Sequence, residues 1–291
     1  MSVTPLVLTT KGLDDYALLD SGHGRKLERF GARTLDRPEE QAIWSPRLSA
    51  AEWEKADAIF TGDVDEEGAG RWKRSAGLEE SWICSHGRLR FACRFTSFRH
   101  VGAFPEQEAH WEFMREHLRL AGGTPSLLNL FGYTGLASLV AADIGAEVTH
   151  VDASRKAIAW ARENQVLSKL VDRPVRWITD DAPKFAAREA RRGRHYDGVL
   201  LDPPKFGRGP KNEVWDLFSD LPEMLRLCRE LLKPGGFLIL TAYAIRASFL
   251  SFQRLSEEVL GPGVESGELA LQDQGGGLLA TSLFSRWIAP R

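Results

Sequence analysis

Short apolar runs alternate with amphipathic stretches from residue 104 to the end of the chain. The runs have the length of strands, and the stretches between them have the spacing and length of helices. Predicted strands cover residues 126–131, 148–151, 175–178, 196–201 and 237–241, and predicted helices cover 106–120, 136–142, 155–170, 214–232 and 246–260. A closing hairpin is predicted at 268–272 and 278–287, on either side of three glycines. Strands that alternate with helices predict an α/β fold with a Rossmann-like sheet over residues 104–291.

Residues 1–103 have a different pattern, with many turns and short apolar segments, and predict a small β-rich α+β domain. Between Trp82 and Phe98, apolar side chains alternate with arginines, which predicts a strand with a core face and a solvent face. The apolar set is Leu89, Phe91, Cys93 and Phe95, and the basic set is Arg88, Arg90 and Arg94. Residues 71–100 hold seven Lys or Arg and two Glu, a formal charge of +5. This surface is either a solvated sheet face or a phosphate-contacting surface for RNA, with Trp72 as a core residue or a stacking platform.

Composition sets broad limits on the kind of protein. The chain has 291 residues, 43% apolar and 27% charged, which is typical of a soluble globular protein with one large domain or two smaller ones. A net charge of −2 gives no global attraction to nucleic acid, so any RNA contact must come from local patches. The three cysteines form no C-x-x-C pair, so we expect neither a disulfide framework nor a metal site. Without a signal peptide or a run of membrane length, we expect a cytoplasmic protein with no membrane partner.

The predicted strand 126–131 stops abruptly at a Gly-Tyr-Thr-Gly turn, residues 132–135, and a helix follows. Strand, glycine turn and helix form the first unit of an open α/β sheet, and such turns are where these sheets bind ligands. We expect Gly132 and Gly135 to let the backbone approach a ligand. Asp152, seventeen residues after Gly135, ends the next strand, where a carboxylate is placed to accept hydrogen bonds from ribose hydroxyls. These residues predict a cofactor that contains adenosine.

The turn also narrows the choice of cofactor. It reads N-x-F-G-x-T-G, one glycine short of the dinucleotide pattern G-x-G-x-x-G, and no Lys-Ser or Lys-Thr pair follows it as in a P-loop. A cofactor with a ribose but no phosphate fits better, which indicates S-adenosylmethionine. The alternative at this point is a structural turn in a domain that holds no cofactor.

Two more polar segments follow predicted strands. Asp180 and Asp181 come after the third strand, where a carboxylate is placed to accept a hydrogen bond from an adenine amino group. The segment Asp-Pro-Pro-Lys-Phe, residues 202–206, follows the fourth strand, and its prolines stop that strand and stiffen its exit. Asp202 is therefore expected at the carboxyl end of a central strand, where the active sites of open sheets lie. The alternative for Asp202 is a helix cap or a turn residue.

The segments NLFGYTG, VDAS, TDDA, LDPPKFG and LLKPGG occur in the order and spacing of class I S-adenosylmethionine-dependent methyltransferases. More narrowly, the chain resembles bacterial large-subunit ribosomal RNA methyltransferases that make 5-methylcytosine or 7-methylguanine, including their lead-in GAFPEQ with Gln107. The resemblance covers roughly residues 100–291. It implies a seven-stranded sheet whose last strand is antiparallel.

The resemblance also implies site residues. The implied cofactor-binding residues are Asn129, Phe131, Gly132, Tyr133, Thr134, Gly135, Asp152, Ala153, Ser154, Asp180, Asp181, Ala182 and Asp202. Within this set, Asp152 would bind the ribose hydroxyls and Asp181 the adenine amine. The implied catalytic residues, which would face the methyl group and the target base, are Asp202, Pro203, Pro204 and Phe206. Asp202 would orient the acceptor or take up its proton, and Phe206 would stack on the base.

One departure from the family concerns cysteine. Methylation of cytosine at C5 needs a thiolate that adds to the ring, and relatives carry that cysteine after the fifth strand or in the Asp-Pro-Pro segment. This chain has no cysteine in either place, so we expect direct transfer to a nitrogen or oxygen, without a covalent intermediate. Lys205, Arg208 and Lys211 lie just beyond the Asp-Pro-Pro segment and are expected to contact RNA phosphates.

We therefore expect an enzyme that transfers a methyl group from S-adenosylmethionine to a nucleotide of RNA, and of ribosomal RNA in particular. One alternative is a methyltransferase that acts on a small molecule or a protein. Another is a binding protein that keeps the cofactor fold without catalysis, and a third is a nicotinamide dehydrogenase. The missing glycine and the Asp-Pro-Pro segment argue against the dehydrogenase. The sequence leaves open the target nucleotide, the methylated atom and the oligomeric state.

Overall fold

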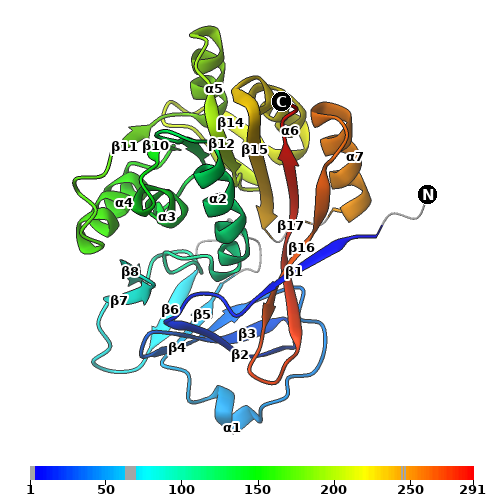
Figure 1. Ribbon diagram of the computed structural model, residues 1–291. Coiled ribbons are helices and arrows are strands. Elements are labelled where there is room, and N and C mark those ends of the chain that lie inside the picture. The colour runs from blue at the N-terminus through cyan, green and yellow to red at the C-terminus, as the bar shows by residue number, and fades with distance from the viewer. Residues whose placement is uncertain (1–3, 63–69, 244, 246) are drawn as a thin grey trace. The chain divides into compact units, whose positions relative to one another are not determined.

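The computed structural model describes residues 4–62, 70–243, 245 and 247–291 (Figure 1). The chain divides into two compact units. The α/β unit consists of residues 4–8, His110–Glu268 and Ser282–Arg291, and the β-rich unit consists of Thr9–Ala109 and Leu269–Thr281. The β-rich unit therefore includes the turn of the C-terminal hairpin, Leu269–Thr281. The expected division into 1–103 and 104–291 assigns these residues to the α/β domain. The reason is local, because the backbone N–H of Gln274 donates to the carbonyl of Leu18 at 3.1 Å.

The largest sheet has eight strands in the order β1-β16-β17-β15-β12-β9-β10-β11. Its strands are β1 (Leu6–Thr10), β9 (Ser126–Leu130), β10 (Glu147–Asp152), β11 (Val175–Thr179), β12 (Tyr196–Leu201), β15 (Leu232–Tyr243), β16 (Glu265–Gln272) and β17 (Leu278–Ile288). The last strand, β17, is antiparallel to β15, as expected. The sheet has one strand more than the expected seven, because β1, from the start of the chain, lies at the edge beside β16.

The α/β unit contains six α-helices among its described residues: α2 (Glu108–Leu120), α3 (Leu136–Asp143), α4 (Arg155–Leu167), α5 (Ala182–Arg191), α6 (Leu217–Glu230) and α7 (Phe249–Leu260). Within the described ranges, no helix is both long and apolar enough to cross a membrane. Helices α3 and α4 contact each other, and α6 contacts both α5 and α7.

The order of the parallel strands reverses between β9 and β12. The chain runs from β9 outward through β10 to β11, and it then returns to β12 and continues to β15 in the other direction. Because connections between parallel strands are right-handed, this reversal places α3 and α4 on one face of the sheet and α6 on the other. Open α/β sheets bind ligands at such a reversal, beyond the carboxyl ends of the strands.

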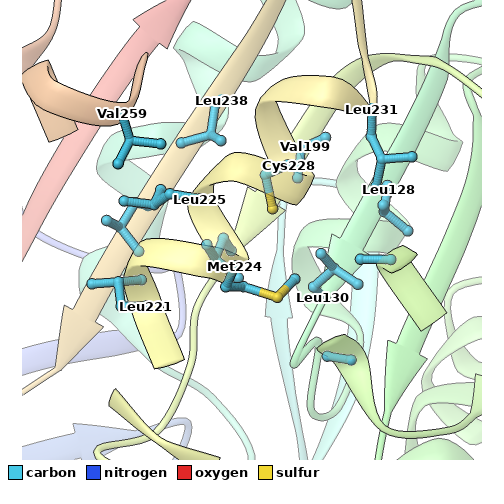
Figure 2. Close-up of a cluster of buried hydrophobic side chains, with 14 of the residues drawn as sticks. Leu128, Leu130, Val199, Leu221, Met224, Leu225, Cys228, Leu231, Leu238 and Val259 are labelled. Carbon is cyan, nitrogen blue, oxygen red and sulfur yellow. The ribbon is translucent and has the colours of Figure 1, made fainter. Parts of the chain in front are cut away.

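The core of the α/β unit lies between the sheet and α6 (Figure 2). The apolar positions of α6 recur every three or four residues and so form one buried face, at Leu221, Met224, Leu225 and Cys228. They pack against Leu128, Val199 and Leu238, from three neighbouring strands of the sheet. Burial of each such leucine or methionine contributes about 1.5–3 kcal/mol. This core holds β9, β12 and β15 in the register on which the site depends.

The β-rich unit contains a five-stranded sheet in the order β2-β3-β4-β5-β6 and a separate two-stranded sheet, β7-β8. Its strands are β2 (Tyr16–Gly22), β3 (Arg25–Phe30), β4 (Arg33–Pro38), β5 (Ala58–Thr61), β6 (Arg71–Arg74), β7 (Ser81–His86) and β8 (Leu89–Arg94). A helical turn, α1 (Ala50–Trp53), and a 3-10 helix, η1 (Pro105–Gln107), complete its regular elements among the described residues. The expected β-rich N-terminal domain is confirmed.

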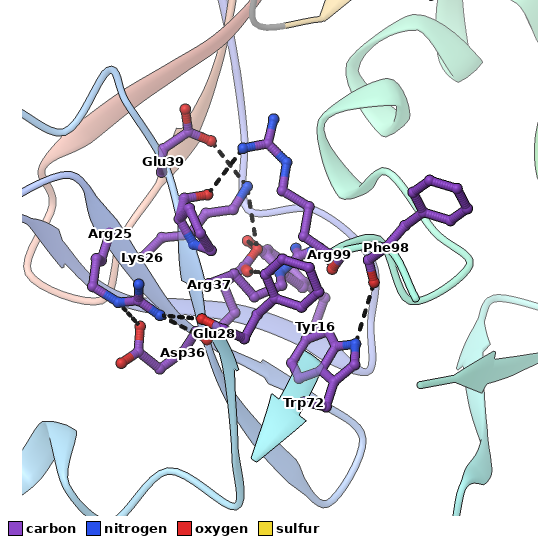
Figure 3. A network of polar contacts seen from close by, with 12 residues as sticks. Tyr16, Arg25, Lys26, Glu28, Asp36, Arg37, Glu39, Trp72, Phe98 and Arg99 are labelled. Carbon is purple, nitrogen blue, oxygen red and sulfur yellow. Dashed lines mark hydrogen bonds and ion pairs between the residues drawn. The ribbon is translucent and has the colours of Figure 1, made fainter. Parts of the chain in front are cut away.

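Charged side chains form a network inside this unit (Figure 3). The carboxylate of Glu28 accepts a hydrogen bond from Tyr16 Oη at 2.7 Å and one from Arg37 Nε at 2.7 Å. Lys26 Nζ lies 3.1 Å from Glu39 Oε2 and 3.8 Å from Glu28 Oε1. Burial acts to raise the pKa of Glu28, but Arg37 and Lys26 outweigh it and the pKa is lowered. Removal of one partner from such a buried ion pair typically costs about 3–5 kcal/mol, since the other charge loses its compensation.

Candidate functional site

The strands β10, β9 and β12 end at one level of the sheet. Leu130 of β9 pairs with Val151 of β10 and with Leu201 of β12. The next residues along the three strands are Phe131, Asp152 and Asp202, which therefore form one row across the sheet. Because neighbouring strands lie about 4.8 Å apart, the backbones of Asp152 and Asp202 flank that of Phe131 at about 5 Å on either side. The structure thus brings together three segments that the sequence analysis selected separately.

The turn after β9 has an unusual backbone. Two residues other than glycine have positive φ, Phe131 at 58° and Tyr133 at 51°, and Gly135 follows at 81°. Such conformations are uncommon for side chains larger than Asn or Asp, and strained residues of this kind are concentrated at functional sites. The turn is held to its neighbour because Gly132 N donates to Val151 O at 3.1 Å.

The two glycines of this turn are required by the packing of the protein itself. A Cβ on Gly132 would lie 2.3 Å from His150 Cε1, and a Cβ on Gly135 would lie 2.9 Å from the ring of Trp177. The Cβ position of each glycine is therefore occupied by a side chain of β10 or β11. The approach of a ligand to this stretch of backbone stays a prediction.

A buried hydrogen-bonded chain lies below the turn. Asn129 Nδ2 donates to Ser138 Oγ at 2.9 Å, and Ser138 Oγ lies 2.9 Å from His150 Nδ1. Burial lowers the pKa of His150 to about 3, so the imidazole is neutral. Asn129, expected to line the methionine end of the cofactor, is thereby fixed in orientation by the first turns of α3.

Asp152 joins the two turns at this edge of the sheet. Its Oδ2 accepts a hydrogen bond from Tyr133 N at 2.9 Å, and its Oδ1 accepts one from Ser154 N at 2.8 Å. Burial raises the pKa of this carboxyl. Each carboxylate oxygen can accept two hydrogen bonds, so both oxygens keep acceptor capacity for a pair of vicinal hydroxyls. This donor and acceptor arrangement fits a ribose.

The other residues of these turns have structural roles as well. Ser154 is the N-cap of α4, and its Oγ accepts from Ala157 N at 3.2 Å, while Ala153 beside it is half-buried. The carbonyl of Thr134 accepts a hydrogen bond from Asn164 Nδ2 at 3.0 Å. Helix α4 therefore fixes the turn after β9 from the outer side.

The segment after β11 holds two carboxylates in different surroundings. Asp181 is 7% exposed and caps α5, with Oδ1 accepting from Lys184 N at 3.0 Å. Burial raises the pKa of Asp181. Asp180 forms an ion pair with Arg188, and Ala182 is the buried first residue of α5. Of the two carboxylates, Asp180 is the one that forms an ion pair among the described residues.

The Asp-Pro-Pro segment leaves β12 directly beside the first turn. The backbone N–H of Asp202 donates to the carbonyl of Leu130, the last residue of β9, at 3.4 Å. Asp202 is half-buried and Pro203 is buried, whereas Pro204 and Lys205 are exposed. The segment therefore passes from the sheet to the surface within four residues.

The structure corrects the prediction of a helix over residues 214–232. Helix α6 begins at Leu217, after the N-cap Asp216, and Val214–Asp216 form a short strand, β14. This strand is antiparallel to β13 (Phe206–Arg208), so Phe206 lies half-buried in a hairpin of residues 206–216. The pattern was misread because the apolar residues of β14 continue the spacing of those in α6.

Trp215, in this hairpin, is a residue that the sequence analysis missed. Its Nε1 donates to the carbonyl of Pro204 at 2.8 Å, and its ring centroid lies 4.9 Å from that of Phe131. The side chain is 3% exposed. Trp215 therefore contacts both the turn after β9 and the Asp-Pro-Pro segment. An isolated aromatic residue in no motif gives no sequence signal for such a role.

All three cysteines lie in the interior. Cys84, Cys93 and Cys228 are each at most 1% exposed. Cys228 packs in the core around α6 (Figure 2), and burial raises the pKa of its thiol. None of the three is placed as an accessible thiolate.

Comparison with known proteins decides the family. A family described as S-adenosylmethionine-dependent methyltransferase matches residues 30–259. The chain belongs to this family. S-adenosylmethionine is therefore its cofactor, and the methyltransferase identification from the sequence motifs is confirmed.

Relatives of this methyltransferase include a solved structure and curated proteins. A crystal structure titled SAM-dependent methyltransferase, from Agrobacterium tumefaciens, has a TM-score of 0.92 and 52% identity, over 98% of this chain and 94% of that chain. The ribosomal RNA large subunit methyltransferase K/L of Desulfotalea psychrophila is 31% identical over 66% of this chain and 26% of its own length. The protein of the same name from Syntrophotalea carbinolica is 31% identical over 60% of this chain and 24% of its own. The chain thus spans about a quarter of the length of these two relatives.

Proposed function

We propose that this methyltransferase transfers a methyl group from S-adenosylmethionine to a nucleotide of RNA, and that large-subunit ribosomal RNA is the substrate. The observation that carries the proposal is the row formed by Phe131, Asp152 and Asp202 at the point where the strand order reverses. In this row the backbones of Asp152, on the cofactor side, and Asp202, on the substrate side, are two strand spacings apart, roughly 10 Å. The names of the curated relatives supply the class of substrate.

The cofactor would be held by the two turns around Asp152. Asp152 would accept from the ribose hydroxyls, since both its oxygens keep acceptor capacity beside their backbone donors. Asp181 would accept from the adenine amine, and Asn129 and the turn of residues 131–135 would lie at the methionine end. When bound, the cofactor supplies a methyl group on a positively charged sulfur.

Asp202 would act on the substrate side. The hydrogen bond from its backbone to Leu130 and the two prolines that follow limit its movement. Its carboxylate would orient the acceptor atom or take up its proton, while Phe206 would stack on the base. Lys205, Arg208 and Lys211 are exposed around this segment and would contact phosphates.

Burial of all three cysteines favours transfer to a nitrogen or an oxygen. A C5 mechanism needs a thiolate that reaches the pyrimidine ring. Cys228 lies within the packed core of α6, and Cys84 and Cys93 are buried in the β-rich unit. The acceptor atom would then attack the methyl group directly, and the protein would mainly align the two and exclude water.

The exposed basic residues of the β-rich unit would add RNA contacts. Arg88 and Arg90 are exposed and Arg94 is half-buried, while Leu89 and Phe91 point into the core, as the alternation predicts. Trp72 is half-buried and packs on Phe60 and Phe95, with ring centroids 5.2 and 5.0 Å away, so part of its ring contributes to the packing of this unit.

The test is a methylation assay with radiolabelled cofactor on RNA from a strain that lacks the protein, followed by mapping of the modified nucleotide. Asp202→Ala should lower turnover about a hundredfold while the Kd for S-adenosylhomocysteine stays within about twofold. Asp152→Ala should raise that Kd about tenfold or more, equivalent to about 1.4 kcal/mol. Thermal melts of both variants serve as the control, because Asp152 also accepts from two backbone N–H groups of its own turns. Label that enters protein or small molecules and not RNA would show that the substrate is wrong and favour the alternative.

A further inference from the structure

The tip of the β13–β14 hairpin lies against the carboxylate of Asp181. A Cβ on Gly209 would come within 2.9 Å of Asp181 Oδ2 and 2.4 Å of Glu213 Oε2. Real Cβ atoms essentially never approach a neighbour closer than 3.0 Å. Gly209 is not among the residues with positive φ, so the requirement for glycine here comes from space and not from backbone conformation.

One further hydrogen bond connects this tip to the start of α5, and a second lies within the tip. Glu213 Oε1 accepts from Lys184 Nζ at 2.8 Å, and its Oε2 accepts from Lys211 N at 2.8 Å. Within the hairpin, Gly209 N donates to Glu213 O at 2.9 Å. The hydrogen bond from Lys184 is the main cause that lowers the pKa of Glu213 to about 2, so the Glu213 carboxylate is ionised near neutral pH.

Asp181 has little freedom to move away from the hairpin. Its Oδ1 is engaged as the N-cap of α5, at 3.0 Å from Lys184 N. Its Oδ2 is therefore the oxygen that faces Gly209. A donor that reaches Oδ2 has to lie next to the hairpin tip, with little water around it because Asp181 is 7% exposed.

We propose that Gly209 is a specificity-determining residue, which lets the hairpin close the adenine side of the cofactor site so that Asp181 selects a purine with an amino group at C6. The inference rests on the proposed role of Asp181 as the partner of the adenine amine. A purine with a carbonyl at C6 presents a second acceptor to this carboxylate. In a site shielded from water, such a mismatch leaves polar groups unpaired and is rejected strongly, whereas in an open site water relieves it.

The test compares two ligands that differ at this atom, S-adenosylhomocysteine and S-inosylhomocysteine, by calorimetry on the full chain. The wild type should bind the adenine compound at least about tenfold more tightly. Gly209→Ala should reduce the ratio of the two dissociation constants to about threefold or less, mainly through weaker binding of the adenine compound. Gly207→Ala is the matched control in the same hairpin, because its Cβ would lie 3.3 Å from Pro204 Cγ, which a small shift relieves. Its ratio should stay within about twofold of the wild type.

A second variant covers the case in which Gly209→Ala does not fold. Glu213→Gln keeps the number of non-hydrogen atoms but weakens the hydrogen bond to Lys184, and it should also lower the ratio of the two affinities. If the folded variants keep the wild-type ratio while Asp152→Ala weakens binding, the inference is wrong and the proposed function stands. If the wild type binds neither ligand, or Asp152→Ala has no effect, the cofactor site itself is wrongly assigned and the inference falls with it.

Discussion

Replacement of Glu106 by glutamine is expected to stabilise the protein above neutral pH. Glu106, in the 3-10 helix η1, is 1% exposed. Among the described residues, its Oε1 accepts no hydrogen bond. Burial raises the pKa of this carboxyl from 4.5 to about 7, against the opposing effect of Lys26. A buried acid of this kind is destabilising once it is ionised, because the charge has left water without full compensation.

The sign and size follow from proton linkage. Between pH 4.5 and about 7, the folded state binds more protons at Glu106 than the unfolded state does, so stability falls as pH rises through this window. A shift of roughly 2.5 pKa units at about 1.4 kcal/mol per unit gives a cost of about 3 kcal/mol above the window. Glutamine has nearly the same shape and no charge, so Glu106→Gln should recover up to about 3 kcal/mol at about pH 8 and almost nothing at about pH 4.5.

The measurement is urea unfolding of both proteins at these two pH values. Glu79→Gln is the matched control in the same unit, since Glu79 is exposed and its replacement should change the unfolding free energy by less than about 0.5 kcal/mol. A Glu106→Gln variant that is destabilised equally at both pH values would refute the reasoning. That result would mean that the carboxylate is stabilised in the folded state by Lys26 more than it is penalised by burial.

Three other predictions concern the site. Trp215→Phe removes the donor to Pro204 O and keeps a ring near Phe131, so kcat should fall about tenfold with the KM for the cofactor nearly unchanged; an unchanged kcat with a lowered Tm would mean a purely structural role. Replacement of Arg88, Arg90 and Arg94 by alanine should flatten the salt dependence of RNA binding by about one unit of slope per lost contact. An unchanged slope would assign these arginines to a solvated face. A chain with all cysteines changed to alanine should fold and stay active, whereas a covalent adduct of the wild type with 5-fluorocytosine RNA that these changes abolish would contradict direct transfer.

The sequence predicts four of the parallel strands closely, whereas β15 begins five residues before the predicted run 237–241. The strands β9, β10, β11 and β12 begin and end within one residue of the predicted runs. Strands β9, β10 and β12 are largely buried on both faces, so each appears in the sequence as a short apolar run between turns, whereas the edge strand β11 is only half-buried. The carboxylates that follow them are then placed by the sheet, because parallel strands present their carboxyl ends at one edge. This is why the row of Asp152 and Asp202 could be predicted without any contact information.

The hairpin of residues 206–216 could not be predicted in the same way. Its strands have three residues each, too few to show a period of two against a background of helix-like spacing. The one available signal was Asp216, a good N-cap residue, which marks the true start of α6. The reason for Gly132 and Gly135 was also hidden, because the side chains of His150 and Trp177 reach them across the sheet from positions distant in the sequence.

The hairpin adds a connection that neither motif shows by itself. Its base contacts Phe131 and Pro204 through Trp215, and its tip contacts Asp181 and the first turn of α5 through Gly209 and Glu213. One element of eleven residues, 206–216, therefore touches the first turn, the adenine-side carboxylate and the Asp-Pro-Pro segment. A change at the tip should alter the selection of the cofactor, whereas a change at the base should alter turnover. Both ends belong to one short hairpin, so the substitutions Gly209→Ala and Trp215→Phe should not act independently. The change in cofactor binding free energy in the double variant should therefore differ from the sum of the changes in the two single variants.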